Sequence, residues 1–168
     1  MKNAYIPTKN PRFSLRFAVP EDAALVVSFM KKLGTYQKML EHITATEEDL
    51  TKLLAERRGE AVFGDYDGET IGFIYFYQNS SAFTGQSGLY IDGFLVDTSF
   101  RGGGLGRIML AFMSKLALER GCRRVEWGCL DWNDQAIKFY RSMGAYSVDE
   151  MTVFRFAPDQ LKKTADLF

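Results

Sequence analysis

The first half of the chain shows apolar residues in two spacings, one typical of strands and one of helices. Residues 13–18, FSLRFA, alternate between apolar and polar side chains and predict a strand. Residues 19–36 begin with a proline and two acidic residues and continue with helical spacing, so they predict a helix that Gly34 closes. Thr46, three residues before an aspartate, has the spacing of a capping box, which predicts a second helix to about Arg58.

The middle of the chain predicts strands separated by polar turns. Residues 61–78 predict a hairpin whose turn is the Asp-Gly pair at 67–68. A polar loop is expected over 79–88, followed by a strand over 89–97. Three consecutive glycines then precede a helix that is expected to reach about Arg120.

The last third predicts a strand over 122–130, a helix over 133–144, and a final strand pair or one broken strand over 145–157. Strands and helices in this order predict an α/β fold, in which helices pack on the faces of a mixed sheet. Residues 1–12 are polar and lack periodicity, so a flexible N-terminal arm is expected there. Residues 13–168 are expected to form a single domain.

Composition narrows the class of protein. The chain has 168 residues, with 21 Lys plus Arg and 21 Asp plus Glu, so its formal net charge is zero. This balance argues against a nucleic-acid binder, although a local cluster can still hold a small anion. Cys122 and Cys129 cannot form a disulfide framework and are expected to be buried thiols. Neither a secretory signal nor an apolar run of about 18 residues is evident, so a soluble, cytoplasmic protein without membrane contact is expected.

The segment RGGGLG, residues 101–106, has features of an anion-binding turn. Glycine permits a positive φ and places no Cβ between the backbone and a ligand. The first amides of the following helix lack intrahelical partners and carry the positive end of its dipole. A phosphate or diphosphate site flanked by Arg101 and Arg107 is therefore one interpretation. A tight strand-to-helix turn that binds nothing is the other, because a glycine cluster alone does not decide between them.

Two well-known phosphate loops fit this segment poorly. A Walker loop needs a Lys-Ser/Thr pair after its glycines, and here the sequence continues RIM. The dinucleotide loop lies near the start of its fold, whereas four or five elements precede this turn.

Longer segments resemble a known family. FLVDTSFRGGGLG, VEWGCL and WNDQAIKFYRSMGA are similar to the GNAT family of N-acetyltransferases, over about Phe13 to Phe156. Diamine (spermidine/spermine) and thialysine acetyltransferases are the most similar members. The resemblance implies a mostly antiparallel sheet with a splayed parallel strand pair and helices on both faces. It also implies direct attack of a primary amine of a small molecule on acetyl-CoA, with no metal, and a homodimer.

The resemblance assigns residues to the cofactor. Main-chain amides from Gly102 to Arg107 are expected to hold the diphosphate of coenzyme A. Main-chain groups of residues 94–96 are expected to pair with the pantetheine arm as an added strand does. The resemblance implies a cofactor contact at Asn133, and the same residue is suited to be a helix N-cap, either instead of this contact or in addition to it. The full cofactor set is Phe94, Leu95, Val96, Arg101, Gly102, Gly103, Gly104, Leu105, Gly106, Arg107, Asn133, Ala136 and Tyr140.

Two side chains are assigned to the chemistry. Acetyl transfer leaves a coenzyme A thiolate, and Tyr140 is expected to donate a proton to it as general acid. Core packing is the alternative role for Tyr140, because helical spacing places it beside apolar residues. The amine must arrive deprotonated although a free alkylamine has a pKa of about 10.4. Asp92 is expected to accept that proton through a water or to attract the ammonium group, and a solvated strand acid is the alternative.

The acceptor site departs from the diamine enzymes. Those enzymes carry a glutamate followed by a second acid where this chain has Asp92 and Gly93. They also carry a tyrosine-glutamate pair that helps bind the polyamine, and this chain has Tyr36 and Gln37 there, so the resemblance implies that these two residues contact the acceptor. Fewer carboxylates weigh against a polyamine and leave open a smaller amine, such as a lysine-like amino acid. Glu126 is a further acceptor-binding candidate, with an exposed strand residue as the alternative.

Two other functions are compatible with these residues. The same fold can acetylate a protein or peptide amine, such as an N-terminus. A sensor that binds coenzyme A without catalysis is the non-enzymatic reading, against which the tyrosine at 140 argues.

Overall fold

The computed structural model describes residues 4–168. Its internal contacts divide the chain into two units, residues 1–131 and 132–168. Within the described residues, the first unit holds all the strands, and the second consists of helices and extended chain. That residues 13–168 form a single domain stays a prediction.

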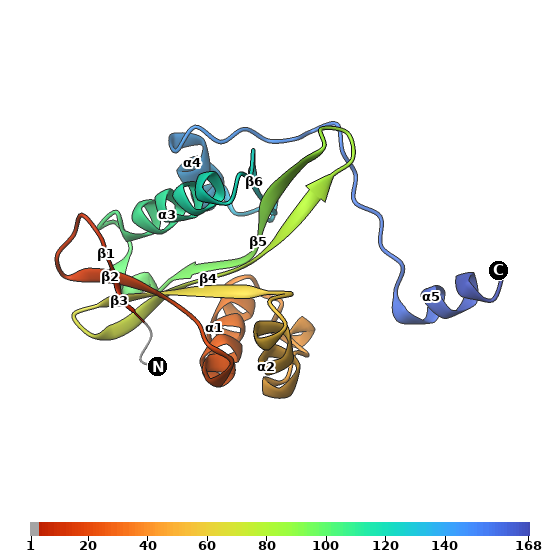
Figure 1. Ribbon diagram of the computed structural model, residues 1–168, viewed down its shortest axis with the longest axis horizontal. Helices are drawn as coiled ribbons and strands as arrows, with labels where there is room; N and C mark the ends of the chain where they lie inside the picture. The colour runs from red at the N-terminus through yellow and green to blue at the C-terminus, as the bar shows by residue number, and fades with distance from the viewer. Residues whose placement is uncertain (1–3) are drawn as a thin grey trace. The chain divides into compact units, whose positions relative to one another are not determined.

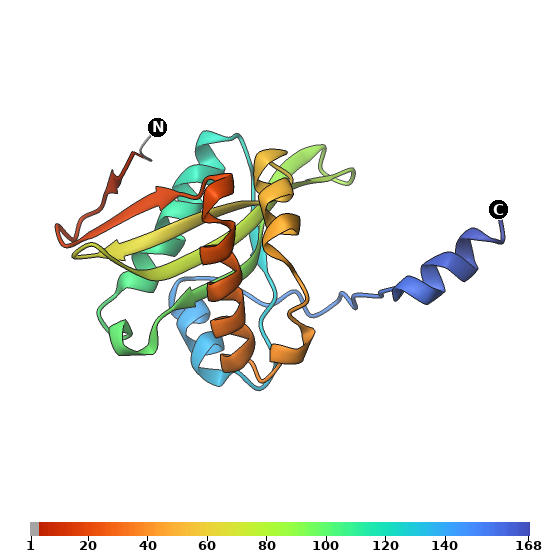
Figure 2. The ribbon, with the colours of Figure 1, turned by 90° about the horizontal axis from the view of Figure 1, so that it is seen from below.

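The first unit is built on a six-stranded sheet whose strands follow chain order, β1 to β6 (Figures 1 and 2). Neighbouring strands are antiparallel except for the last pair, β5 and β6, which is parallel. This confirms the predicted mixed, mostly antiparallel sheet. The strands are β1 (Ile6–Pro7), β2 (Phe13–Phe17), β3 (Glu60–Tyr66), β4 (Glu69–Ser81), β5 (Gln86–Val96) and β6 (Val125–Trp127).

Helices cover both faces of this sheet. α1 (Ala23–Tyr36) and α2 (Glu47–Ala55) lie on one face, and α3 (Leu105–Glu119) lies on the other (Figure 1). The second unit contains α4 (Asp134–Ser142) and α5 (Pro158–Ala165). Three single-turn helices complete the described elements, at Pro20–Asp22, Leu40–His42 and Thr98–Phe100.

The core fills the space between the sheet and the helices on each side. Phe29 of α1 packs against Phe63 and Phe73 of the sheet, with ring centroids 5.8 Å and 5.5 Å away. On the other face, Gly64 and Gly72 lie opposite each other on β3 and β4. A Cβ built on either glycine would lie 3.2 Å or 2.7 Å from the sulfur of Met109. The two glycines therefore make room for the methionine of α3.

Two local predictions are confirmed, one at a helix start and one at a hairpin turn. Thr46 and Asp49 form the predicted capping box, because each side chain accepts a hydrogen bond from the other's main-chain amide. Asp67 and Gly68 both have positive φ, +50° and +87°, and join β3 to β4 as a hairpin.

Asp22 anchors the start of α1. Its carboxylate accepts hydrogen bonds of 2.8 and 3.1 Å from Arg16 and one of 2.9 Å from the amide of Val19. Burial alone raises the pKa of Asp22, but the hydrogen bonds from Arg16 and Val19 and the charge of Arg16 outweigh it. The pKa of Asp22 therefore lies below its usual value.

Two predicted boundaries were wrong. Gly34 does not close the first helix but lies buried within α1, where an added Cβ would be 2.8 Å from Cγ1 of Ile43. The polar loop predicted over 79–88 is mostly strand, since Asn79 pairs with Gly88 in a long hairpin. The side chains are polar because this part of the hairpin is mostly exposed. The main chain still forms strands, because the two strands pair with each other.

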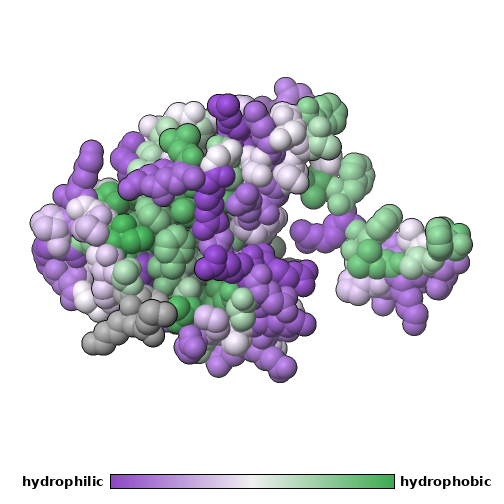
Figure 3. Space-filling model, in the orientation of Figure 1, coloured by the Kyte–Doolittle hydropathy of each residue, from purple (hydrophilic) through white to green (hydrophobic). Residues whose placement is uncertain are grey.

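The ends of the chain also differ from expectation. Ile6 and Pro7, inside the predicted flexible arm, pair with β2 as a short strand, while residues 1–3 lie outside the described residues. No strand forms over 145–157, so the predicted final strands were wrong, and α5 follows instead. Figure 3 shows apolar side chains on the surface of the segment that carries α5. Within residues 145–168, the exposed large apolar residues are Tyr146, Val148, Met151, Val153, Phe154, Phe156, Leu161, Leu167 and Phe168.

Candidate active site

The parallel strand pair separates before β5 ends. β6 pairs with β5 only from Leu89 to Ile91, whereas β5 continues to Val96 with β4 on its other side. Residues 92–96 therefore extend past the last parallel pairing between β5 and β6. This is the segment whose main chain is predicted to pair with pantetheine.

A β-bulge lies at the point of separation. Tyr75 pairs with Gly93 and Phe76 pairs with Ile91, so Asp92 is the extra residue on β5. A bulge bends its strand and redirects a side chain, and such features are common beside active sites. Asp92 is exposed. The sequence placed Asp92 on β5 but gave no sign of the bulge.

Two tyrosines that are not among the predicted site residues, Tyr75 and Tyr77, lie close enough to Asp92 for its charge to act on them. Burial raises the pKa of Tyr75, and the charge of Asp92 raises it further. The pKa of Tyr77 is raised by burial and then by Tyr90 and Asp92. The rings of Tyr77 and Tyr90 stack with centroids 5.3 Å apart. A carboxylate close to aromatic rings is suited to an alkylammonium group. Tyr75 and Tyr77 alternate within a predicted strand, so the sequence could have indicated that both lie on the same face of the sheet.

The glycine turn joins β5 to α3 as predicted. Gly102 and Gly104 have φ of +85° and +78°, a conformation that L side chains rarely adopt. Within residues 4–168, the main-chain amides of 102–106 donate no hydrogen bond to another main-chain group, whereas Ile108 bonds to the carbonyl of Gly104. The exposed residues 102–104 thus present unpaired donors at the positive end of α3.

Gly103 differs from its two neighbours. Its φ is not positive, and the nearest atom to an added Cβ is the carbonyl oxygen of Phe100 at 3.9 Å. Neither the backbone conformation nor internal packing requires glycine at this position. Close approach of an outside group is a physical reason for a glycine here.

Arg101 connects three of the predicted site residues. Its Nε donates a hydrogen bond of 3.0 Å to the carbonyl of Val96, at the end of β5. Its guanidinium carbon lies 4.5 Å from the centre of the Tyr36 ring. The structure therefore brings the end of α1, the end of β5 and the start of the turn together. Gln37, next to Tyr36, is half-buried.

Glu126 and Cys129 have local partners. Glu126 accepts a hydrogen bond of 2.8 Å from Arg124, which also donates one of 3.1 Å to Asn79. The acceptor-binding role of Glu126 stays a prediction. Burial raises the pKa of the Cys129 thiol, and Asp131 adds to it, so a reactive thiolate is disfavoured. Cys122 is buried, as expected, whereas Cys129 is only half-buried, so its predicted burial was wrong.

The second unit carries the remaining predicted residues. Asn133 is only 8% exposed, and its Oδ1 accepts a hydrogen bond of 3.3 Å from the amide of Ala136. The N-cap role of Asn133 is thereby confirmed. Tyr140 is half-buried on α4, with its ring centroid 5.4 Å from that of Phe139. The cofactor contacts of Asn133 and Ala136 and the acid role of Tyr140 stay predictions.

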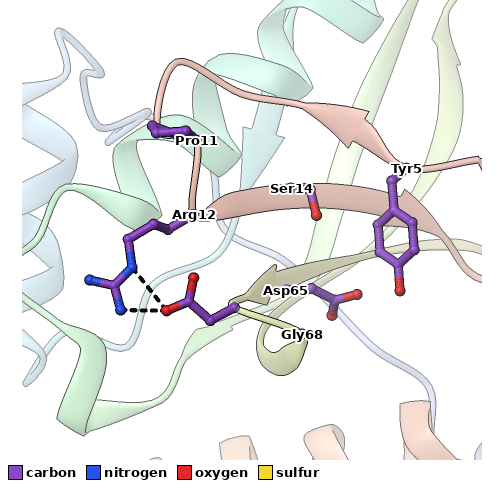
Figure 4. Close-up of a pocket in the computed structure, with 7 residues that line it drawn as sticks. Tyr5, Pro11, Arg12, Ser14, Asp65 and Gly68 are labelled. Carbon is purple, nitrogen blue, oxygen red and sulfur yellow. Dashed lines mark hydrogen bonds and ion pairs between the residues drawn. The ribbon is translucent and has the colours of Figure 1, made fainter.

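A cleft of about 350 Å³ lies elsewhere, between the N-terminal strands and the β3–β4 turn (Figure 4). Arg12 forms two hydrogen bonds with Asp67 at its border, and Asp65 accepts one of 2.6 Å from Thr70. The cleft contains none of the predicted site residues; it is lined by Tyr5, Pro11, Arg12, Ser14, Asp65, Asp67 and Gly68.

Comparisons with known proteins agree with this architecture. Residues 28–145 match the sequence profile of the Acetyltransferase (GNAT) family, which is more than half of the chain. The chain belongs to the GNAT acetyltransferase family. It is an enzyme, an acetyltransferase, as the sequence predicted.

Named relatives include enzymes that act on amino acids. An L-ornithine N5-acetyltransferase from Arabidopsis thaliana is 32% identical over 116 residues, which cover 69% of this chain and 48% of that protein. The chain thus spans about half of the length of that relative. A thialysine N-epsilon-acetyltransferase from Caenorhabditis elegans is 27% identical over 157 residues, which cover 92% of this chain and 98% of that protein. The predicted similarity to thialysine acetyltransferases is confirmed.

Solved structures share the fold. An aminoglycoside acetyltransferase from an uncultured soil metagenomic sample has a TM-score of 0.74 at 18% identity, covering 89% of this chain and 99% of that chain. At this identity the likeness concerns the fold alone. Over residues 4–168, no helix has the length and apolar character needed to cross a membrane. The same residues contain no group of three or more His, Cys, Asp or Glu side chains placed to bind a metal.

Proposed function

We propose that this acetyltransferase moves an acetyl group from acetyl-CoA to a primary amine of a small molecule. The observation that carries the proposal is the glycine turn, where exposed amides at the start of α3 have no main-chain partner. Those donors, the helix dipole and Arg101 suit a diphosphate. The names of the relatives, which act on ornithine and thialysine, support an amino-acid-like acceptor.

The proposed reaction is a direct displacement. The amine nitrogen bonds to the thioester carbonyl carbon, and the carbon–sulfur bond breaks. The ammonium form of the amine first loses one proton to water or, through water, to Asp92. Tyr140 gives its phenolic proton to the departing sulfur, and the second proton, which nitrogen loses as the amide forms, passes through water to restore the phenol. Asp92 lies at the bulge where β5 leaves β6, beside two tyrosines with raised pKa values.

The acceptor is proposed to carry one ammonium group near Asp92 rather than several. Gly93 and Gln37 supply no carboxylate where the diamine enzymes have acids, and Glu126 is already paired with Arg124. A polycation gains from several charge-assisted contacts, and this chain offers fewer of them. Ornithine, lysine and thialysine are therefore better candidates than spermidine.

A panel assay tests the proposal. Thiol release from acetyl-CoA is measured with ornithine, lysine, thialysine, spermidine and a short peptide with a free N-terminus. Turnover with the amino acids, and less with spermidine, is expected. Turnover with the peptide alone would favour a protein acetyltransferase instead. Binding of coenzyme A without turnover on any acceptor would favour the sensor.

A homodimer and a cytoplasmic location are part of the proposal. The exposed apolar residues of 146–168 support a dimer, because such side chains gain free energy when another surface covers them. Analytical ultracentrifugation tests this, and a dimer that dissociates when Phe154 and Phe156 are replaced by serine is expected. A monomer at all concentrations would rule the dimer out.

A further inference from the structure

We propose that Tyr36 is a positioning residue for the cofactor, acting through Arg101, rather than a contact for the acceptor amine. The inference rests on the proposed function and deepens it at the same site. Tyr36 ends α1, and Arg101 begins the glycine turn, so the two meet only through the tertiary fold.

The guanidinium of Arg101 is fixed from two directions. Its Nε donates to the Val96 carbonyl at 3.0 Å, and its central carbon lies over the Tyr36 ring, 4.5 Å from the ring centre. A hydrogen bond and a cation–π contact together restrict the rotamers of a long side chain that is otherwise mobile. The charge is thereby held at the end of β5, on the residue that precedes the glycine turn, before any ligand arrives.

Arg101 also differs from other well-ordered arginines in the first unit. Arg16 is hydrogen-bonded to Asp22, Arg120 to Glu60 and Arg124 to Glu126, so each charge is matched by a carboxylate. Within residues 4–168, no Asp or Glu forms an ion pair with Arg101. An unmatched guanidinium on the residue that precedes the unpaired amides is complementary to an anion such as a diphosphate.

Preorganisation gives Tyr36 its effect. An arginine that is already held in place loses less conformational entropy when it binds, so the ring improves cofactor affinity without touching the cofactor. The ring, and not the hydroxyl, supplies this contact. Tyr36→Phe should therefore preserve it, and Tyr36→Leu should remove it.

The test is calorimetric titration of the full chain with coenzyme A, together with steady-state kinetics. Tyr36→Leu is expected to weaken binding of coenzyme A about five-fold, as loss of one cation–π contact implies. The KM for acetyl-CoA should rise by a similar factor while the KM for the amine stays constant. Tyr36→Phe should keep both values within about two-fold of the wild type.

Two controls separate positioning from general damage. Tyr5→Leu makes the same replacement at an exposed tyrosine just before β1 and should leave coenzyme A binding unchanged. In an Arg101→Met background, Tyr36→Leu should have almost no further effect, because the partner through which it acts is gone. Thermal melting of every variant verifies that each one is folded.

The outcomes are distinguishable. If the wild type does not bind coenzyme A, the proposed function itself fails. If the wild type binds it and Tyr36→Leu binds it equally well, only this inference fails. Two other results would also overturn the inference and return Tyr36 to the acceptor site. One is that Tyr36→Leu raises only the KM for the amine. The other is that adding Tyr36→Leu to Arg101→Met weakens coenzyme A binding by the same factor as it does in the wild type.

Discussion

Replacing Gly103 by alanine separates the two possible reasons for the glycine turn. Because φ is not positive and an added Cβ meets nothing closer than 3.9 Å, the folded protein tolerates the methyl group. Alanine also restricts the unfolded chain, which stabilises a protein by about 0.4–1 kcal/mol at compatible sites. For a chain of this size, the melting temperature should stay constant or rise by about 1–4 °C.

Affinity for coenzyme A should change in the opposite direction. A methyl group at the exposed turn hinders close approach of the diphosphate to the amides. The loss of one hydrogen bond to a charged group costs about 1.5–3 kcal/mol, which is at least a ten-fold increase in Kd. Differential scanning calorimetry and titration calorimetry on the same preparation measure the two quantities.

Gly104→Ala is the matched comparison. Its φ of +78° makes alanine unfavourable by about 1–2 kcal/mol, so the melting temperature should fall by about 2–8 °C. The reasoning is refuted if Gly103→Ala keeps full affinity for coenzyme A, or if it destabilises the protein as much as Gly104→Ala does.

Three further predictions concern other residues. Tyr140→Phe should lower kcat by about 10²–10⁴-fold with little change in the KM for acetyl-CoA, and undiminished turnover would contradict the acid role. Asp22→Asn should lower the free energy of unfolding by about 1–2 kcal/mol at pH 7. Because the pKa of Asp22 is lowered on folding, this stability difference is fully present above the unfolded pKa, near 3.8, and disappears as the pH falls through the folded pKa. Denaturant melts of both proteins at several pH values measure the difference, and a difference that stays constant with pH would contradict the prediction. Gly34→Ala should destabilise the protein by about 1–3 kcal/mol because its Cβ would overlap Ile43, and an unchanged denaturation midpoint would show that the contact relaxes freely.

Local signals allowed much of the fold to be predicted. The capping box at Thr46 and the Asp67–Gly68 turn form within a few residues of chain, so short sequence patterns suffice for them. Gly34 resembled a helix terminus, but it lies within α1, where the close packing of Ile43 leaves no room for a larger side chain. The strands predicted over 145–157 failed for a related reason: a strand needs a partner, and the alternating pattern does not show whether one is available.

In the candidate site too, features within one continuous segment could be predicted, whereas features that depend on contacts between elements could not. The glycine turn and its helix follow from a contiguous segment, and the structure has both where they were predicted. The bulge at Asp92 depends on the register between β4 and β5, which sequence spacing does not reveal. The contact between Arg101 and Tyr36 joins residues of two separate elements, so neither position alone indicated it.

The central claim is that the main-chain amides of the glycine turn hold the diphosphate of coenzyme A. Amide NMR of the ¹⁵N-labelled chain during titration with coenzyme A tests it most directly. The account predicts that the resonances of residues 102–106 shift most, and that pantetheine, which lacks the diphosphate, leaves them in place. Binding of coenzyme A that leaves these amides unperturbed would contradict it.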